Sequence, residues 1–347
     1  MNRFDGLSST GSRSEDMAGR PASAKIVGTG MYVPRRVMTN ADFTHIVDTS
    51  DEWIVQRTGM RQRRIAEVGQ ATSDLAIEAC RAALADADVA PDQVDLVLCA
   101  TITADNTLPS TACWLQDRLG CKRAGAYDLS AACSGHIYGL AQARAFILSG
   151  QARTVLVVSA ETLSKITDYT DRGTCVLFGD GAGAAVVQAS DEAATGIIYT
   201  TLYADGSGGS LMLLPAGGSR QPASHETVDQ RLHYMHISGR EVFKFAVLKM
   251  EELIDECLKA CSLKAADVRL VIPHQVNVRI IDAATGRLGF PAEKVFLNID
   301  KYGNTGGASV AIAHDEARRQ GLLRPGDVAV LIAFGGGLTW AGAVVKH

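Results

Sequence analysis

Residues 128–135 read Asp-Leu-Ser-Ala-Ala-Cys-Ser-Gly, and residues 300–307 read Asp-Lys-Tyr-Gly-Asn-Thr-Gly-Gly, 172 positions later. Two further pairs of segments recur in the same order. Residues 94–98 resemble 268–272 at an offset of 174, and a Phe-Gly turn leads into a small, β-branched segment at both 178–187 and 334–345. Three ordered pairs predict a duplicated unit whose equivalent loops meet at one interface. This interface would bring Cys133 close to Asn304.

Outward from these segments, short apolar runs alternate with helix-like stretches. Continuous apolar runs are typical of strands buried on both faces, so the alternation predicts an α/β fold with helices on both sides of its sheets. The predicted strands are 24–28, 94–99, 154–159, 184–187, 268–272 and 328–334, and the predicted helices include 73–86, 135–148 and 241–259.

The repeat also divides the chain. Residues 24–195 form the predicted first half, which carries the cysteine, and residues 196–347 form the second, which carries a histidine and an asparagine. Residues 1–23 are rich in Ser, Gly, Arg and Asp and lack the apolar core of a secretory signal, so they are interpreted as a disordered tail.

Composition narrows the function classes. Of 347 residues, 47% are hydrophobic and 21% charged, with a formal net charge of −4, which is typical of a globular protein and argues against a broad nucleic-acid-binding surface. No apolar run is long enough to predict a membrane span. The eight cysteines contain no CxxC pair, so we expect free thiols in a reducing cytoplasm and no metal site.

Three polar residues are candidates for chemistry. Cys133 lies between a predicted strand and a helix, where the helix dipole would favour the nucleophilic thiolate, although a buried structural cysteine fits the same spacing. His274 follows a buried strand, and Asn304 lies in a glycine-rich turn; an ordinary loop histidine and turn asparagine are the alternatives. Residues 335–337 (Gly-Gly-Gly) could present amides as an oxyanion hole or form a plain turn.

The full set of motifs resembles the β-ketoacyl-acyl-carrier-protein synthase III family of thiolase-fold condensing enzymes, from about residue 24 to the C-terminus. The resemblance implies a layered α-β-α-β-α sandwich of two duplicated halves, a homodimer, and a long tunnel ending at the nucleophile. The motifs are TNADF (39–43), DTSDEWIVQRTGMRQRRI (48–65), AACSG (131–135), TDRGT (170–174), FGDGAGAA (178–185), HQVNVRII (274–281), YGNTGGAS (302–309) and AFGGGLTW (333–340).

Site roles follow from the resemblance, residue by residue. Cys133 matches the acyl-accepting cysteine, His274 and Asn304 match the decarboxylation pair, and the amides of Cys133 and Gly336 match the oxyanion hole. CoA-binding residues are matched by Trp53, Arg57 and Arg172, and the carrier-protein surface by Lys244, Arg279 and Arg287.

The implied reaction is a ping-pong decarboxylative condensation that starts fatty acid synthesis. Cys133 takes an acyl group from acyl-CoA, and malonyl-acyl-carrier protein then loses CO₂ and attacks it, giving 3-oxoacyl-acyl-carrier protein. CoA and the carrier protein enter as substrates, and no cofactor is implied.

Departures from the family pattern concern the substrate and leave alternatives open. Leu108 stands where a Phe often closes the acyl pocket of acetyl-specific members, and Gly306 and Gly307 stand where Ser or Ala are common. These differences predict a longer or branched primer. They also leave open a specialised condensing or acyl-transferring enzyme of secondary metabolism, or, with less support, a non-catalytic partner subunit.

Overall fold

The computed structural model describes residues 20–347. The predicted tail, residues 1–23, lies outside the described residues except for its last four. Of these, Ser23 is buried and already belongs to β1 (Ser23–Tyr32), so the first strand begins one residue before the predicted strand 24–28.

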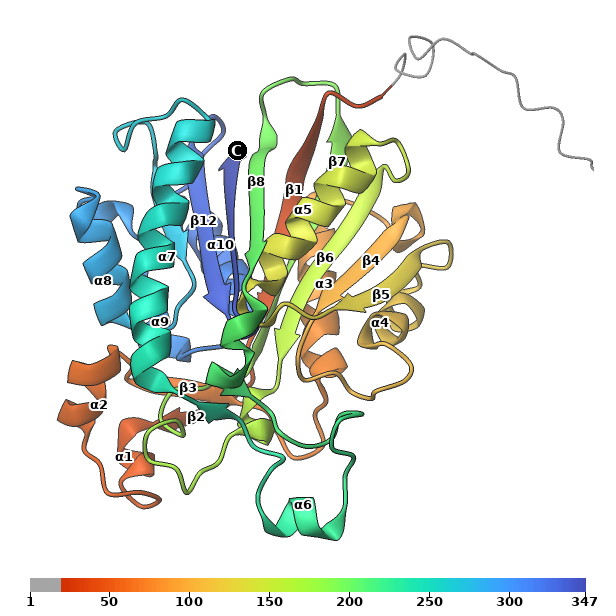
Figure 1. The fold of residues 1–347 in the computed structure, drawn as a ribbon. Helices are drawn as coiled ribbons and strands as arrows, with labels where there is room; N and C mark the ends of the chain where they lie inside the picture. Colours follow the sequence, from red (N-terminus) through yellow and green to blue (C-terminus); the bar gives the residue numbers. More distant parts are fainter. Residues whose placement is uncertain (1–19) are drawn as a thin grey trace, which may run out of the picture.

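Two mixed sheets form the framework, and their strand orders repeat (Figure 1). The first sheet runs β1-β7-β6-β4-β5 and the second runs β8-β13-β12-β11, with the same parallel and antiparallel pairings apart from the extra strand β5. The duplication read from the sequence is therefore present in the fold. The strands of the first sheet are β4 (Leu96–Ala100), β5 (Gly125–Leu129), β6 (Thr154–Glu161) and β7 (Gly181–Ser190), after β1; those of the second are β8 (Gly196–Ala204), β11 (Leu270–Pro273), β12 (Val328–Gly335) and β13 (Thr339–Lys346).

Helices complete five layers, as the sequence predicts. The central layer holds α5 (Gly135–Leu148) and α10 (Ala308–Arg319), which pack between the two sheets. One outer layer holds α3 (Thr72–Ala87) and α4 (Thr111–Leu119), and the other holds α7 (Gly239–Ala260) and α8 (Val278–Arg287), on opposite sides of the molecule in Figure 1. Each sheet is thus covered on both faces, which explains its continuous apolar strands.

A third group of short elements surrounds one end of the sandwich. It comprises β2 (Arg36–Thr39), α1 (Asn40–Phe43), α2 (Asp51–Thr58), β3 (Gln62–Ile65), β9 (Met212–Leu213), α6 (His225–Asp229), β10 (His236–Ile237) and α9 (Ile299–Tyr302). The buried guanidinium of Arg63 on β3 donates from Nε to the Val176 carbonyl at 2.9 Å and from Nη1 to Asn40 Oδ1 at 2.5 Å. Because these acceptors lie in separate segments, Arg63 ties this end of the molecule together.

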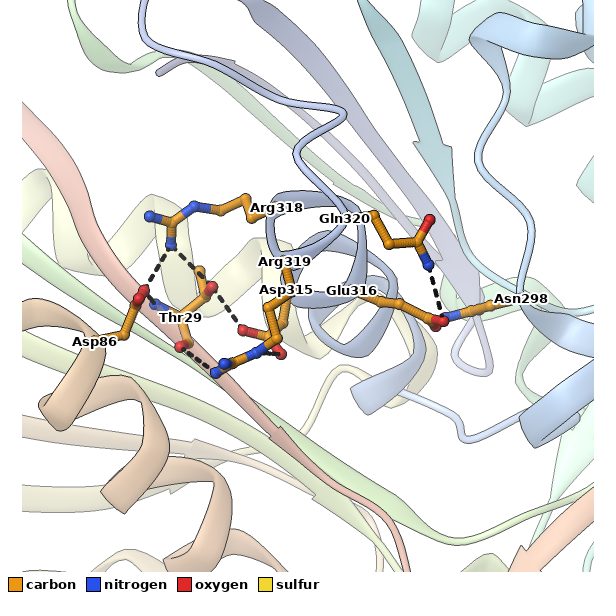
Figure 2. Close-up of polar contacts among 8 residues, drawn as sticks. All are labelled: Thr29, Asp86, Asn298, Asp315, Glu316, Arg318, Arg319 and Gln320. Atoms are coloured by element: carbon orange, nitrogen blue, oxygen red, sulfur yellow. Dashed lines mark hydrogen bonds and ion pairs between the residues drawn. The ribbon is translucent and has the colours of Figure 1, made fainter.

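Figure 2 shows the polar contacts that join the two halves beside the central layer. Thr29 on β1 donates from Oγ1 to the fully buried Asp315 of α10 at 2.8 Å, and Arg319 donates to the other Asp315 oxygen at 2.7 Å. Arg318 reaches Thr29 Oγ1 at 2.8 Å and Asp86 of α3 at 3.2 Å. Hydrogen bonds to charged partners typically stabilise by about 1.5–3 kcal/mol each, less where a side chain is exposed. The network fixes α10, and with it the turn that carries Asn304, against the first half.

Candidate active site

Cys133 lies at the tip between β5 and α5, in a single 3-10 turn, Ala132–Ser134. The preceding Ala132 has φ +46°, in the left-handed region that costs a non-glycine residue about 1–3 kcal/mol. Gly335, at the end of β12, packs against this turn so closely that a Cβ there would lie 2.6 Å from the Cys133 amide nitrogen. The strained turn and the glycine together hold the thiol at the meeting point of the two halves.

His274 follows β11 directly, as predicted, and its ring is buried. Its backbone N–H donates to the Ile332 carbonyl at 2.7 Å, and its Nδ1 lies 2.6 Å from Ser309 Oγ on α10. The ring meets Phe334 edge-on, with centroids 5.6 Å apart. Nδ1 is occupied by Ser309, so Nε2 is the nitrogen left for a substrate.

Asn304 is held by its backbone against one segment of the first half, residues 177–179, in a parallel bridge to Phe178. Its N–H donates to the Leu177 carbonyl at 2.9 Å, and its carbonyl accepts from the Gly179 N–H at 2.9 Å. The side-chain Oδ1 accepts from the Gly306 N–H at 2.8 Å. Since Oδ1 is engaged within the turn, Nδ2 is the donor available to a ligand.

The three candidate residues line one narrow cavity. Its walls are otherwise almost entirely apolar; they include Ile102, Leu163, Phe178, Met212, Met235, Val242, Phe245, Val276, Phe334 and Leu338. An apolar chamber with a thiol, an imidazole and an amide facing it suits an acyl chain whose carbonyl reacts at the polar groups.

Burial overturns the expectation of a resting thiolate. Desolvation, with a smaller contribution from nearby Glu161, raises the pKa of the Cys133 thiol to about 12, so the dipole of α5 does not compensate for the loss of water. Burial also lowers the pKa of His274 to about 3. At neutral pH the site therefore holds a neutral thiol beside a neutral imidazole.

A second, wider and more open cavity continues from the first. The two share Phe178, Met212, Val242, Val276 and Asn304 along their walls. The outer part is lined by Trp53 and Arg57 of α2 and by Arg279 of α8. Arg172 lies over the Trp53 ring at 4.6 Å from its centroid, and Arg57 lies at 5.9 Å. The result is a passage that is cationic and aromatic at its mouth and apolar at its base.

The remaining predicted residues fall in different places. Lys244 is exposed on α7. Arg279, on α8, lies over the ring of Phe243 on α7, with its guanidinium carbon 5.8 Å from the ring centroid. Arg287 is exposed and pairs with Glu251 at 3.1 Å. Gly336, whose amide is predicted to belong to the oxyanion hole, does not line the cavity that contains Cys133. Its neighbour Gly335 does.

Leu108 does not line either cavity of the chain. It is 87% exposed, in the loop that precedes α4. The amides of Thr111 and Ala112 at the start of α4 each donate to the Asp128 carboxylate at 2.7 Å, which fixes the end of this loop. The prediction that Leu108 shapes this chain's own acyl pocket is therefore not supported.

Two residues of the candidate site were not predicted from the sequence. Ser309, which contacts the His274 ring, stands inside the quoted YGNTGGAS motif but has no signal that separates it from its neighbours. Glu161 lines the cavity and ends a strand whose other residues are Thr, Val, Leu, Ser and Ala. A carboxylate that completes an otherwise uncharged buried strand is unusual, and this signal was available. Among residues 20–347, no three His, Cys, Asp or Glu side chains are arranged to hold a metal ion.

Comparisons with known proteins match this chain to one enzyme family along most of its length. Residues 127–206 match the family "3-Oxoacyl-[acyl-carrier-protein (ACP)] synthase III", and residues 258–347 match its C-terminal counterpart. A β-ketoacyl-[acyl-carrier-protein] synthase III of Caldanaerobacter subterraneus is 55% identical over 324 residues, which cover 93% of this chain and 98% of the relative. The corresponding protein of Clostridioides difficile is 49% identical, with the same coverage.

Solved structures give the same result. The 3-oxoacyl-[acyl-carrier-protein] synthase III of Aquifex aeolicus superposes with a TM-score of 0.86 at 47% identity, covering 93% of this chain and all of that one. The priming β-ketosynthase of the R1128 polyketide pathway superposes with a TM-score of 0.87 at 36% identity, covering 94% and 97%.

Proposed function

Since the chain belongs to the 3-oxoacyl-[acyl-carrier-protein] synthase III family, we propose that Cys133, His274 and Asn304 are the catalytic residues of its condensation reaction. The enzyme is an acyltransferase that joins an acyl-CoA primer to malonyl-acyl-carrier protein and so initiates fatty acid synthesis. The observation that carries the assignment of residues is the single apolar cavity that all three line.

The first half-reaction loads the enzyme. Cys133 Sγ attacks the thioester carbonyl of acyl-CoA, the bond to the CoA sulfur breaks, and the thiol proton ends on CoA. Because the resting thiol is neutral, the proton has to leave as the new bond forms. Amides at the Cys133 turn and the adjoining Gly335–Gly336 segment are the donors that we assign to the developing oxyanion.

The second half-reaction forms the carbon–carbon bond. Malonyl-acyl-carrier protein loses CO₂, and the electrons of the broken bond give an enolate that attacks the acyl carbonyl on Cys133. His274 Nε2 and Asn304 Nδ2 are the groups left to hydrogen-bond the thioester oxygen of the enolate. The bond between the acyl carbon and Cys133 Sγ breaks, the sulfur takes up a proton from solvent, and 3-oxoacyl-acyl-carrier protein departs. The sequence of steps needs no cofactor.

Intact mass spectrometry tests the function. The purified chain is incubated with acyl-CoAs from acetyl to decanoyl, including branched primers, and malonyl-acyl-carrier protein is then added. We expect one acyl mass on Cys133 that is discharged as 3-oxoacyl-carrier protein, and the preferred acyl group names the primer. A preference for an unusual primer would favour the specialised pathway that the polyketide relative represents. Absence of any adduct would refute the proposed function.

The passage mouth is proposed as the CoA site. Trp53 is flanked by two guanidinium groups, an arrangement that suits a flat heteroaromatic base with phosphates attached. The exposed cations Lys244, Arg279 and Arg287 lie on the neighbouring helices α7 and α8, and an acidic carrier protein is the partner that we propose for them. Arg287 already has a partner in Glu251, so we expect it to contribute least.

Replacing Arg172 with alanine is expected to raise the KM for acyl-CoA about tenfold, because the guanidinium that lies over Trp53 would no longer be there to stack on the bound base, a contact of ~1–2 kcal/mol. The kcat should stay within about twofold, since Arg172 does not line the cavity that contains Cys133. Steady-state kinetics on acyl-CoA measure both. Arg81→Ala, which removes an exposed arginine paired with Glu78 on α3, is the matched control. An unchanged KM in Arg172→Ala would remove it from the CoA site.

A homodimer, in the cytoplasm, is also proposed. Strand β5 is an edge of the first sheet and pairs only with β4, so its outer hydrogen-bonding groups are available to a second copy. Beside it, Leu108 is 87% and Trp114 of α4 is 41% exposed. Leu108 could reach an acyl pocket only in a neighbouring chain across such an interface.

Light scattering after size exclusion tests the assembly. We expect twice the 36.8 kDa chain mass for the wild type and a shift toward the single-chain mass for the double variant Leu108→Glu, Trp114→Glu. Burying two carboxylates at an apolar interface costs several kcal/mol. Val68→Glu, at a 96% exposed position elsewhere, should leave the mass unchanged. A wild type of single-chain mass would contradict the proposal.

A further inference from the structure

Glu161 is a buried carboxylate inside the catalytic cavity that the reaction described above does not use. It is the last residue of β6 and is 1% exposed. It lines the same cavity as Cys133, His274 and Asn304. Among the ion pairs within residues 20–347, none involves Glu161. A buried acid without a cation requires a structural or chemical reason.

On one side, the carboxylate organises the segment after β4. Thr103 donates from Oγ1 at 2.6 Å, Thr101 from Oγ1 at 3.3 Å, and the Ile102 N–H lies 3.2 Å from both carboxylate oxygens. Ile102 is itself part of the cavity wall. Glu161 therefore fixes the backbone from which one wall of the acyl chamber projects.

On the other side, the same side chain packs under the turn that carries Asn304. A Cβ at Gly306 would lie 3.1 Å from Glu161 Cγ, and one at Gly307 would lie 3.7 Å from Oε1. Gly306 has φ +56° and donates its N–H to Asn304 Oδ1. The double glycine thus leaves room for the Glu161 side chain, and the contact supports the orientation of the Asn304 amide.

The charge of Glu161 bears on Cys133. Desolvation raises the pKa of Glu161 to about 8, so it is a neutral acid at pH 7 and ionises only in more alkaline solution. Once ionised, it is the nearby negative charge that adds to the effect of burial in raising the pKa of the Cys133 thiol. The groups that hydrogen-bond the carboxylate are two hydroxyls and one backbone amide, and His274, which lines the same cavity, is neutral. Within residues 20–347, no ion pair offsets the charge of Glu161.

We propose that Glu161 is a positioning residue, which holds the 101–103 segment and the Asn304 turn on either side of Cys133, and that ionisation of Glu161 slows the reaction of Cys133. The inference rests on the proposed function in that Cys133 is taken as the nucleophile. It extends that function by giving the reactivity of Cys133 a pH dependence set by a residue that does not touch the reacting atoms.

Alkylation of Cys133 by iodoacetamide, followed by peptide mass spectrometry from pH 6 to pH 10, tests the charge without any acyl substrate. Wild type and Glu161→Gln should label at rates within about twofold of each other below pH 8. Toward pH 10 the Gln variant should become about tenfold faster, the equivalent of one unit in the pKa of the thiol. Parallel profiles across the whole range would overturn the proposal.

A second pair of variants keeps the test decisive if Glu161→Gln folds poorly in a thermal melt. Thr103→Val removes the shortest hydrogen bond to the carboxylate, which stabilises its charged form, so the break in the labelling profile should move to higher pH. Thr103→Ser keeps the hydroxyl and should leave the break in place. A break at the same pH in both variants would contradict a role for Glu161 ionisation.

A further experiment separates the proposed function from the Glu161 inference. Acyl transfer from acyl-CoA to the enzyme is measured by intact mass over the same pH range. If acyl transfer is absent while alkylation depends on Glu161, the proposed function fails and the Glu161 inference stands. If acyl transfer proceeds with identical pH profiles in wild type and Glu161→Gln, the function stands and the inference fails.

Discussion

Cys133→Ala is expected to lose acyl transfer by about 10⁴-fold or more, because removal of a covalent nucleophile leaves only binding and oxyanion stabilisation. The variant should show no acyl mass after incubation with any acyl-CoA that labels the wild type. The substitution removes one sulfur atom from a buried turn, so the fold and the walls of the passage should persist. CoA should therefore still bind, as measured by calorimetry.

The matched control is Cys113→Ala, since Cys113 is an exposed free thiol on α4, outside both cavities. It should load and discharge acyl groups like the wild type. An acyl adduct that survives in Cys133→Ala and disappears in Cys113→Ala would move the nucleophile to the surface and refute the site.

The elements best predicted from sequence are those whose pattern is local. The helix predicted at 135–148 coincides with α5, and the predicted strands 154–159 and 328–334 fall within β6 and β12, because continuous apolar runs bounded by turn residues have few other solutions. Strand β8 was not predicted. Its residues, Gly-Ile-Ile-Tyr-Thr-Thr-Leu-Tyr-Ala, are mixed in polarity because the strand lies at a sheet edge, and only its pairing with β13 defines it.

For the candidate site too, local features could be predicted from the sequence and features that depend on the folded chain could not. The positions of Cys133, His274 and Asn304 follow from strand ends and turns, which sequence motifs identify, and the structure brings them to one cavity. Their protonation depends on how much water the folded chain excludes, which no local pattern contains. Burial accordingly shifts the pKa of Cys133 upward, in the direction opposite to the one expected from the helix dipole. Leu108 shows a second limit, since a single residue's place in a loop depends on tertiary contacts such as those of Asp128 with the start of α4.

His274→Ala and Asn304→Ala are each expected to leave acyl loading of Cys133 within about tenfold of the wild type while slowing discharge by malonyl-acyl-carrier protein about 10²–10³-fold. The reason is that the available Nε2 of His274 and Nδ2 of Asn304 are assigned to the enolate oxygen, which exists only after CO₂ has left. The loading step has its own donors at the Cys133 turn. The double variant should lose less than the product of the two single effects, because both groups serve one oxyanion.

Intact mass provides the measurement: the acyl adduct should accumulate on both variants and persist after malonyl-acyl-carrier protein is added, whereas wild type is discharged. His225→Ala, an exposed histidine on α6, is the control and should behave like wild type. Burial lowers the pKa of His274 to about 3, so the imidazole is already neutral at pH 5 and gains no charge until far more acidic solution. Discharge should accordingly show no His274 titration between pH 5 and pH 8. If loading and discharge fell together in His274→Ala, or if discharge followed an ionisation near pH 6.5 that the variant lacks, then His274 would act as a proton acceptor for Cys133 rather than as a hydrogen-bond donor to the enolate.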